Sequence, residues 1–139
     1  MSKRGDFVIV SAPGDYGKPR PALVIQSDWI SAESTLVALV TSEIVDAPIY
    51  RLTIEPSESN GLKVRSQVMV DKIVALPRSK CSRIIGQIDA AGLIALNAMI
   101  AVVVGIADPR PSRRERGGIV DKAGRRFRNA PLGKRSDDQ

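Results

Sequence analysis

Short apolar runs separated by turn-forming residues dominate the first two thirds of the chain. β-Branched and other apolar residues fill six segments whose lengths are typical of β-strands. The predicted strands are 7–10, 22–25, 36–40, 50–54, 67–73 and 83–88. Segments 22–25 and 36–40 are continuously apolar, which predicts burial on both faces, whereas 50–54 alternates and is typical of a half-exposed strand. Together these short strands predict a compact, mostly antiparallel barrel.

A helical periodicity begins after the sixth predicted strand, with Asp89 as the expected N-cap. Large apolar residues then recur at helical spacing, at Leu93, Leu96, Ile100 and Val103. The opposite side is apolar too, with Ile94, Ala98, Ala101 and Gly105. A helix that is apolar all round needs cover on two sides, which predicts packing on the barrel and against a second copy of the chain. Asp108-Pro109 is predicted to end the helix.

Charge divides the chain at the end of this helix. Residues 1–107 hold 11 Lys/Arg against 10 Asp/Glu, a net of +1, whereas residues 108–139 hold 10 against 5, a net of +5. The basic segment has too few apolar residues to offset its chain entropy. We therefore expect a folded domain over 1–107 and a basic, disordered tail over 108–139. The tail is interpreted as a solvated extension or as an arm that attracts RNA or an acidic partner.

The composition excludes several kinds of chemistry. The chain has no histidine and one cysteine, Cys81, which removes Ser-His and Cys-His pairs, an intrachain disulfide and the usual metal ligands. We expect no metal and no cofactor. Aromatic residues make up only 4% of the chain, which argues against a wide base-stacking platform. Without a signal-peptide pattern or an apolar stretch of membrane-spanning length, a cytoplasmic protein with no membrane contact is expected.

Four landmarks in the sequence resemble the MazF/PemK toxin family, in the family's order and over residues 3–107. The first is Lys3–Val10 together with Gly14–Val24, and the other three are Leu39–Ser42, Ser66–Ile73 and Ile85–Asp89. The resemblance implies a mainly β fold with a C-terminal α-helix, a small SH3-like antiparallel barrel of the CcdB/PemK-like type, acting as a homodimer. It also implies sequence-specific, metal-independent cleavage of single-stranded RNA, by the toxin of a type II toxin–antitoxin system whose partner is a cognate antitoxin.

The same resemblance assigns catalysis to Arg20 and Thr41. Attack by the RNA's own 2′-hydroxyl needs a group that stabilises charge on the phosphorane, and a planar guanidinium can hold two phosphate oxygens. Pro19 and Pro21 stiffen the backbone on either side of Arg20. The Thr41 hydroxyl can donate a hydrogen bond to the same phosphate.

Other residues are candidates for RNA binding: Tyr16, Lys18, Ser42 and Arg65. The general base stays open because the usual proton shuttle, histidine, is missing. Asp15 and Asp71 are the alternatives, and for Asp71 a structural ion pair with Lys72 or Arg51 is the favoured interpretation. The shortened first loop and Met69, where some family members have a second catalytic Arg, depart from the family's pattern, so the cut sequence does not transfer.

Two other functions stay open at this point. A CcdB-like poison of DNA gyrase would act through its terminal helix, so Arg20 and Thr41 would be dispensable. An inactive SH3-like binding module would need an aromatic-lined groove for proline-rich ligands, which the scarcity of aromatics disfavours. The lone tryptophan, Trp29, is interpreted as a packing anchor or a protein contact rather than a base reader.

Overall fold

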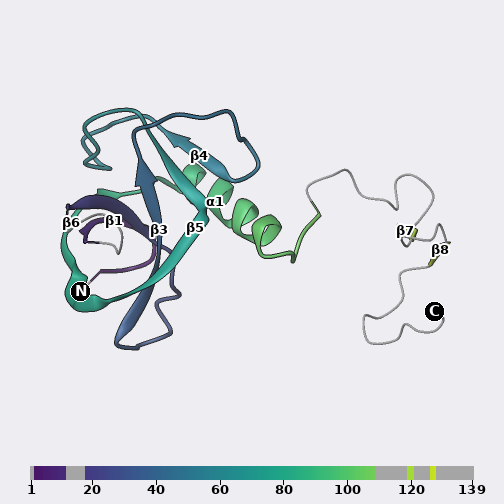
Figure 1. The fold of residues 1–139 in the computed structure, drawn as a ribbon, viewed down its shortest axis with the longest axis horizontal. Coiled ribbons are helices and arrows are strands. Elements are labelled where there is room, and N and C mark those ends of the chain that lie inside the picture. The colour runs from purple at the N-terminus through teal and green to yellow at the C-terminus, as the bar shows by residue number, and fades with distance from the viewer. Residues whose placement is uncertain (1, 12–17, 109–118, 121–125, 128–139) are drawn as a thin grey trace. The chain divides into compact units, whose positions relative to one another are not determined.

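The computed structural model describes residues 2–11, 18–108, 119–120 and 126–127 (Figure 1). The chain divides into two units, residues 1–107 and 108–139. In the second unit, β7 (Ile119–Val120) pairs with β8 (Arg126–Phe127) in an antiparallel ladder. Nearly all of the predicted tail lies outside the described residues, and its disorder stays a prediction.

Six strands of the first unit form one antiparallel sheet, which Figure 1 shows to be strongly curled. They are β1 (Asp6–Val10), β2 (Arg20–Val24), β3 (Ser34–Thr41), β4 (Arg51–Ile54), β5 (Ser66–Pro77) and β6 (Cys81–Gln87). Their order in the sheet is β4-β5-β3-β2-β1-β6. All six predicted strands are confirmed, although β2 begins earlier than expected, at Arg20.

The middle of the sheet is buried on both faces. Phe7 and Leu23, paired across β1 and β2, belong to a core cluster that also holds Leu96 of the helix. Their neighbours Val8 and Ala22, also paired, belong to a second cluster on the other face. Successive residues of a strand point to opposite faces, so the burial of every residue from Ala22 to Ile25 confirms the prediction from that apolar run. For the run 36–40 the prediction is wrong at Leu36, which is 39% exposed.

Helix α1 (Ala90–Val103) packs against β4 and β5 (Figure 1). The predicted N-cap is confirmed, because the Asp89 carboxylate accepts a 2.7 Å hydrogen bond from the Gly92 N–H. The predicted stop at Asp108-Pro109 is wrong. Gly105 adopts a φ of 86°, and the N–H groups of Gly105 and Ile106 turn back to the helix carbonyls, which ends the helix five residues earlier.

Among the described residues, only one side of α1 is covered. Leu96 is fully buried, and Leu93 and Ile100 pack against the same core, as the helical stripe predicts. Val103, the fourth member of that stripe, is 39% exposed, so the stripe ends one turn sooner than expected. On the outer side Ile94 is 70% exposed. The predicted uncovered apolar side of the helix is therefore present.

The loop between β4 and β5 closes the gap between the two edge strands, β4 and β6. The Asn60 side chain organises the loop by donating to the Glu55 carbonyl and accepting from the N–H groups of Ser57 and Leu62. The Gln87 N–H of β6 donates to the Ser59 carbonyl at 2.8 Å. The two backbones approach so closely at Gly61 and Gly86 that any side chain there would overlap the opposite main chain.

A pair of glycine substitutions tests this closure. Gly61 and Gly105 both have positive φ, but only at Gly61 would a methyl group overlap a neighbour, the Ile85 carbonyl. We expect Gly105→Ala to lower the free energy of unfolding by about 1 kcal/mol, from backbone strain alone. Gly61→Ala adds a steric overlap worth about 1–3 kcal/mol more. Urea unfolding measures both, and equal losses would contradict the closure.

Candidate active site

A cavity of about 350 Å³ opens where the start of β2, the end of β3, the start of β5 and β6 meet. Its described lining contains four cationic and three hydroxyl side chains, and no carboxylate. These polar residues are Lys18, Arg20, Thr41, Ser42, Lys63, Ser66 and Arg83. Such a lining favours a phosphodiester, because charged donors bind phosphate oxygens strongly.

Arg20 and Thr41 face the same cavity because β2 and β3 are antiparallel neighbours. Arg20 is the first residue of β2, and Thr41 is the last residue of β3. The Thr41 hydroxyl oxygen accepts a 3.1 Å hydrogen bond from the Glu43 N–H. An oxygen that accepts from the backbone keeps its own hydrogen, which is then available for a ligand in the cavity.

A buried glutamine fixes the loop that follows Thr41. Gln67 lies opposite Thr41 in the β3–β5 ladder and is only 3% exposed. Its side-chain amide accepts from the Val45 N–H at 3.2 Å and donates to the Val45 carbonyl at 2.9 Å. These two bonds anchor the loop, and with it the position of Ser42, to the sheet.

The family model described as "PemK-like, MazF-like toxin of type II toxin-antitoxin system" matches residues 3–104. The chain belongs to this family. A protein of Mycolicibacterium smegmatis named "Probable endoribonuclease MazF" is 38% identical over 108 residues, which are 76% of this chain and 98% of the relative.

Solved structures of MazF toxins share the fold. An endoribonuclease from a mycobacterial species, in complex with its cognate antitoxin, superposes with a TM-score of 0.66 at 16% identity, over 78% of this chain and all of that one. A MazE–MazF complex from Deinococcus radiodurans gives 0.63 at 21% identity, over 77% of this chain and 98% of that one. The mainly antiparallel fold with a C-terminal helix, expected of a MazF/PemK toxin, is thereby confirmed.

The structure brings some predicted site residues of this MazF-family chain together and leaves others apart. Lys18, Arg20, Thr41 and Ser42 line one cavity. Arg65 does not line it, and its Nε lies 2.9 Å from a carboxylate oxygen of Glu55, with both side chains well exposed. Asp15 and Tyr16 lie outside the described residues.

Asp71 is ion-paired away from the cavity. The Arg51 Nε lies 3.0 Å from one of its carboxylate oxygens, and an Arg51 amino group lies 3.5 Å from the other. The Arg51 guanidinium also sits 5.9 Å from the centroid of the Tyr50 ring. This arrangement is the structural ion pair that was one of the two interpretations of Asp71.

Two cations of the cavity, Lys63 and Arg83, were missed from sequence. Lys63 follows the loop that Asn60 organises, and Arg83 lies on β6 opposite Ile9 of β1. Neither sits in a pattern that distinguishes it from a solvent-exposed charge. Only the tertiary contact of that loop with β6 places them beside Arg20.

The described residues contain no group of three or more His, Cys, Asp or Glu side chains placed to hold a metal ion. None of the described helices is long and apolar enough to cross a membrane.

Trp29 is 94% exposed, so its interpretation as a packing anchor is wrong.

Cys81 is half-buried at the start of β6. Burial raises the pKa of its thiol, and the nearby Arg78 guanidinium opposes this shift only in part. Because the thiolate is the reactive form, we expect iodoacetamide to alkylate Cys81 of the folded protein more slowly than a free thiol at neutral pH. Unfolding in urea should restore the ordinary rate. Alkylation as fast in the folded as in the unfolded protein would contradict the protected environment.

Proposed function

We propose that this chain is the endoribonuclease toxin of a type II toxin–antitoxin system, cutting single-stranded RNA at a specific sequence without a metal. The observation that carries the proposal is the cavity in which four cationic and three hydroxyl side chains converge. Family membership supports the toxin role, and the 38% identical relative named as an endoribonuclease supports the chemistry.

In the proposed reaction the RNA supplies its own nucleophile. The 2′-oxygen forms a bond to the adjacent phosphorus, the bond from phosphorus to the 5′-oxygen breaks, and a 2′,3′-cyclic phosphate and a 5′-hydroxyl result. Arg20 holds the non-bridging oxygens as charge develops on the phosphorane, and Thr41 donates its hydroxyl hydrogen to the same group. The positive charge that a metal would otherwise supply comes from guanidinium and ammonium groups.

Proton transfer completes the chemistry. One proton leaves the 2′-hydroxyl and another must reach the departing 5′-oxygen. Asp71 is held in its ion pair with Arg51, so we assign it a structural role and keep Asp15 as the candidate base. The departing 5′-oxygen takes its proton from the Lys63 ammonium, a cation of the cavity, and the Arg83 guanidinium donates a hydrogen bond to the same oxygen.

Residues around Arg20 and Thr41 are proposed to bind the rest of the RNA. Lys18 and Ser42, which line the cavity, are proposed contacts to the phosphates on either side of the scissile one. Tyr16 is proposed to stack on a base, and Arg65, outside the cavity, to make a weaker outer phosphate contact. A cytoplasmic site of action follows from the substrate.

Two protein partners are part of the proposal. A cognate antitoxin is supported by the solved structures of related toxins in complex with theirs. A homodimer is supported by exposed apolar residues on and just after α1: Ile94 on the helix is 70% exposed, and Val104 and Ile106 beyond its end are 56% and 81% exposed. Exposed apolar surface is typical of interfaces between copies of a chain.

Substitution of Arg20 tests the activity. In metal-free buffer with chelator, we expect Arg20→Ala to cut single-stranded RNA about 10²–10³-fold more slowly than wild type, the usual cost of losing a donor to a developing oxyanion. Arg65→Ala, which removes a cation outside the cavity, should cost a few-fold at most. A folded Arg20→Ala protein as active as wild type would refute the assigned role, and gyrase poisoning would become the hypothesis to test.

Substitution of Ile94 tests the homodimer. We expect Ile94→Asp to convert a dimer into a monomer, because a carboxylate buried in an apolar interface has no compensating partner. Light scattering coupled to gel filtration measures the mass. Since Ile94 is largely exposed within the chain, the thermal unfolding of diluted protein should change little. A wild-type protein that is monomeric at high concentration would contradict the proposed dimer.

A further inference from the structure

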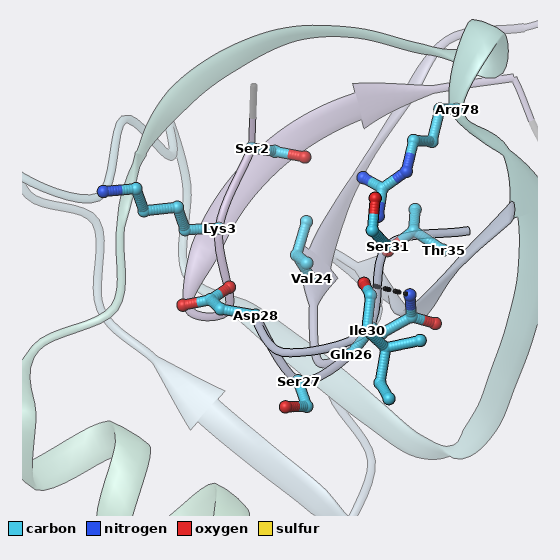
Figure 2. Close-up of a pocket in the computed structure, with 10 residues that line it drawn as sticks. All are labelled: Ser2, Lys3, Val24, Gln26, Ser27, Asp28, Ile30, Ser31, Thr35 and Arg78. Carbon is cyan, nitrogen blue, oxygen red and sulfur yellow. Dashed lines mark hydrogen bonds between the residues drawn. The ribbon is translucent and has the colours of Figure 1, made fainter. Parts of the chain in front are cut away.

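A second cavity, also of about 350 Å³, lies at the far end of β2 and β3 from Arg20 and Thr41 (Figure 2). We call it the distal pocket and define it by its main polar residues, Ser2, Lys3, Gln26, Ser31, Thr35 and Arg78. These residues come from the N-terminal segment, the loop between β2 and β3, the start of β3, and the turn after β5.

Two cationic side chains, Lys3 and Arg78, and one carboxylate, Asp28, line this pocket. The Arg78 Nε donates to the Ala32 carbonyl at 2.7 Å, and Figure 2 shows the guanidinium directed toward Ser31. Arg78 has no carboxylate partner among the residues described. Asp28, the one acidic side chain of the lining, already accepts from the Arg4 N–H at 2.8 Å.

Thr35 points to an incomplete network at the base of the pocket. The residue is 1% exposed, and its hydroxyl has no hydrogen-bond partner in the described part of the chain. A buried hydroxyl without a partner is costly, and most buried polar groups have one. Together with the Arg78 amino groups, it favours a ligand that carries several acceptor oxygens, such as a phosphate group.

An exposed aromatic residue lies in the loop that contributes Asp28 and Ile30 to this pocket. Trp29 is 94% exposed and lies in the loop between Asp28 and Ile30, both of which line the pocket. The backbone N–H of Trp29 donates a 3.1 Å hydrogen bond to the Ser27 hydroxyl oxygen, which fixes the main chain at this residue. An exposed indole next to a phosphate-binding group is the combination that binds a nucleotide of a single strand.

A third cavity, of about 360 Å³, has lining residues in common with both the distal pocket and the candidate active site. It shares Ser2 and Arg78 with the distal pocket, and it shares Arg83 with the cavity that holds Arg20. Arg83 on β6, Arg78 in the turn before β6 and Lys3 in the N-terminal segment therefore contribute positive charge to this series of cavities. A nucleic-acid backbone needs such spaced cations.

We propose that the distal pocket binds a nucleotide of the same RNA strand whose scissile bond lies at Arg20. Arg78 binds its phosphate with the neighbouring hydroxyl groups, and Trp29 stacks on its base. This inference rests on the proposed ribonuclease function and extends the substrate's binding track beyond the cleavage site.

Because the chain has a single tryptophan, fluorescence excited at a wavelength that its two tyrosines do not absorb reports on Trp29 alone. The probe is a 2′-O-methyl oligonucleotide, which cannot undergo attack by its own 2′-oxygen. We expect it to quench Trp29, with an affinity that falls as salt rises. Arg78→Gln should weaken binding about tenfold, whereas Lys80→Gln, which removes the same charge two residues away and outside the lining, should not.

Because Arg78→Gln also removes the hydrogen bond to the Ala32 carbonyl, a second pair of variants, Trp29→Ala and Trp29→Phe, tests binding without that change. Trp29 is exposed, so neither substitution should affect folding much. With a fluorescently labelled oligonucleotide, Trp29→Ala should bind about tenfold more weakly, and Trp29→Phe should restore binding. Trp29→Ala should also raise KM for long RNA without lowering kcat. A merely structural residue would not give this separation.

Other results would overturn the inference. If Trp29→Ala binds the oligonucleotide as tightly as the wild type and has an unchanged KM for long RNA, the proposed ribonuclease function stands but the distal pocket does not bind its substrate. Quenching by an acidic peptide but not by the oligonucleotide would assign the pocket to a protein partner instead. If the wild-type protein cuts no RNA, the proposed function fails, and the titration with the uncleavable oligonucleotide still decides whether the pocket binds nucleic acid.

Discussion

The contact between the β4–β5 loop and β6 is the constraint on which the site depends. The sheet has two edges, and the loop closes the distance between them by placing its backbone directly against β6 at Gly61 and Gly86. Asn60 holds the loop in that shape through hydrogen bonds to its own backbone. Lys63 from one side and Arg83 from the other then reach the cavity of Arg20, so the same contact completes the fold and gathers its charge.

The distribution of charge, rather than its total, gives this domain its chemistry. Residues 1–107 carry a net charge of only +1, yet the candidate active site collects four cations and no carboxylate among its described lining residues. Acidic groups are held elsewhere, as in the ion pairs of Asp71 with Arg51 and Glu55 with Arg65. A nearly neutral domain therefore presents a strongly cationic surface where a phosphodiester would react.

Sequence predicted the elements well because their signals are local. The unbroken apolar run of β2 required burial on both faces, and Asp89 marked the helix start through its own hydrogen bond. The helix end was misplaced because Gly105, with its positive φ, ends the helix before Asp108-Pro109 can act. A glycine within an apolar stretch gives no sign in the sequence of which role it takes.

The candidate site was predictable only in part. Arg20 and Thr41 stand at the ends of neighbouring strands within recognisable landmarks, so a motif could find them. Lys63 and Arg83 resemble any exposed charge along the chain, and only their tertiary neighbours distinguish them. Of the two interpretations of Trp29, the packing anchor is wrong, because a large apolar residue is usually buried and this one is not, whereas a protein contact stays a prediction.

The most direct test of the account is cleavage of a long single-stranded RNA by the wild-type protein in the presence of chelator. The assay is then repeated on the cleaved sequence, made with a single 2′-deoxy nucleotide at the scissile position. We predict discrete cuts in the first RNA, ending in cyclic phosphate, and no cut at the substituted position in the second. A folded protein that cuts no RNA, or that cuts equally well without the 2′-hydroxyl, would contradict the account.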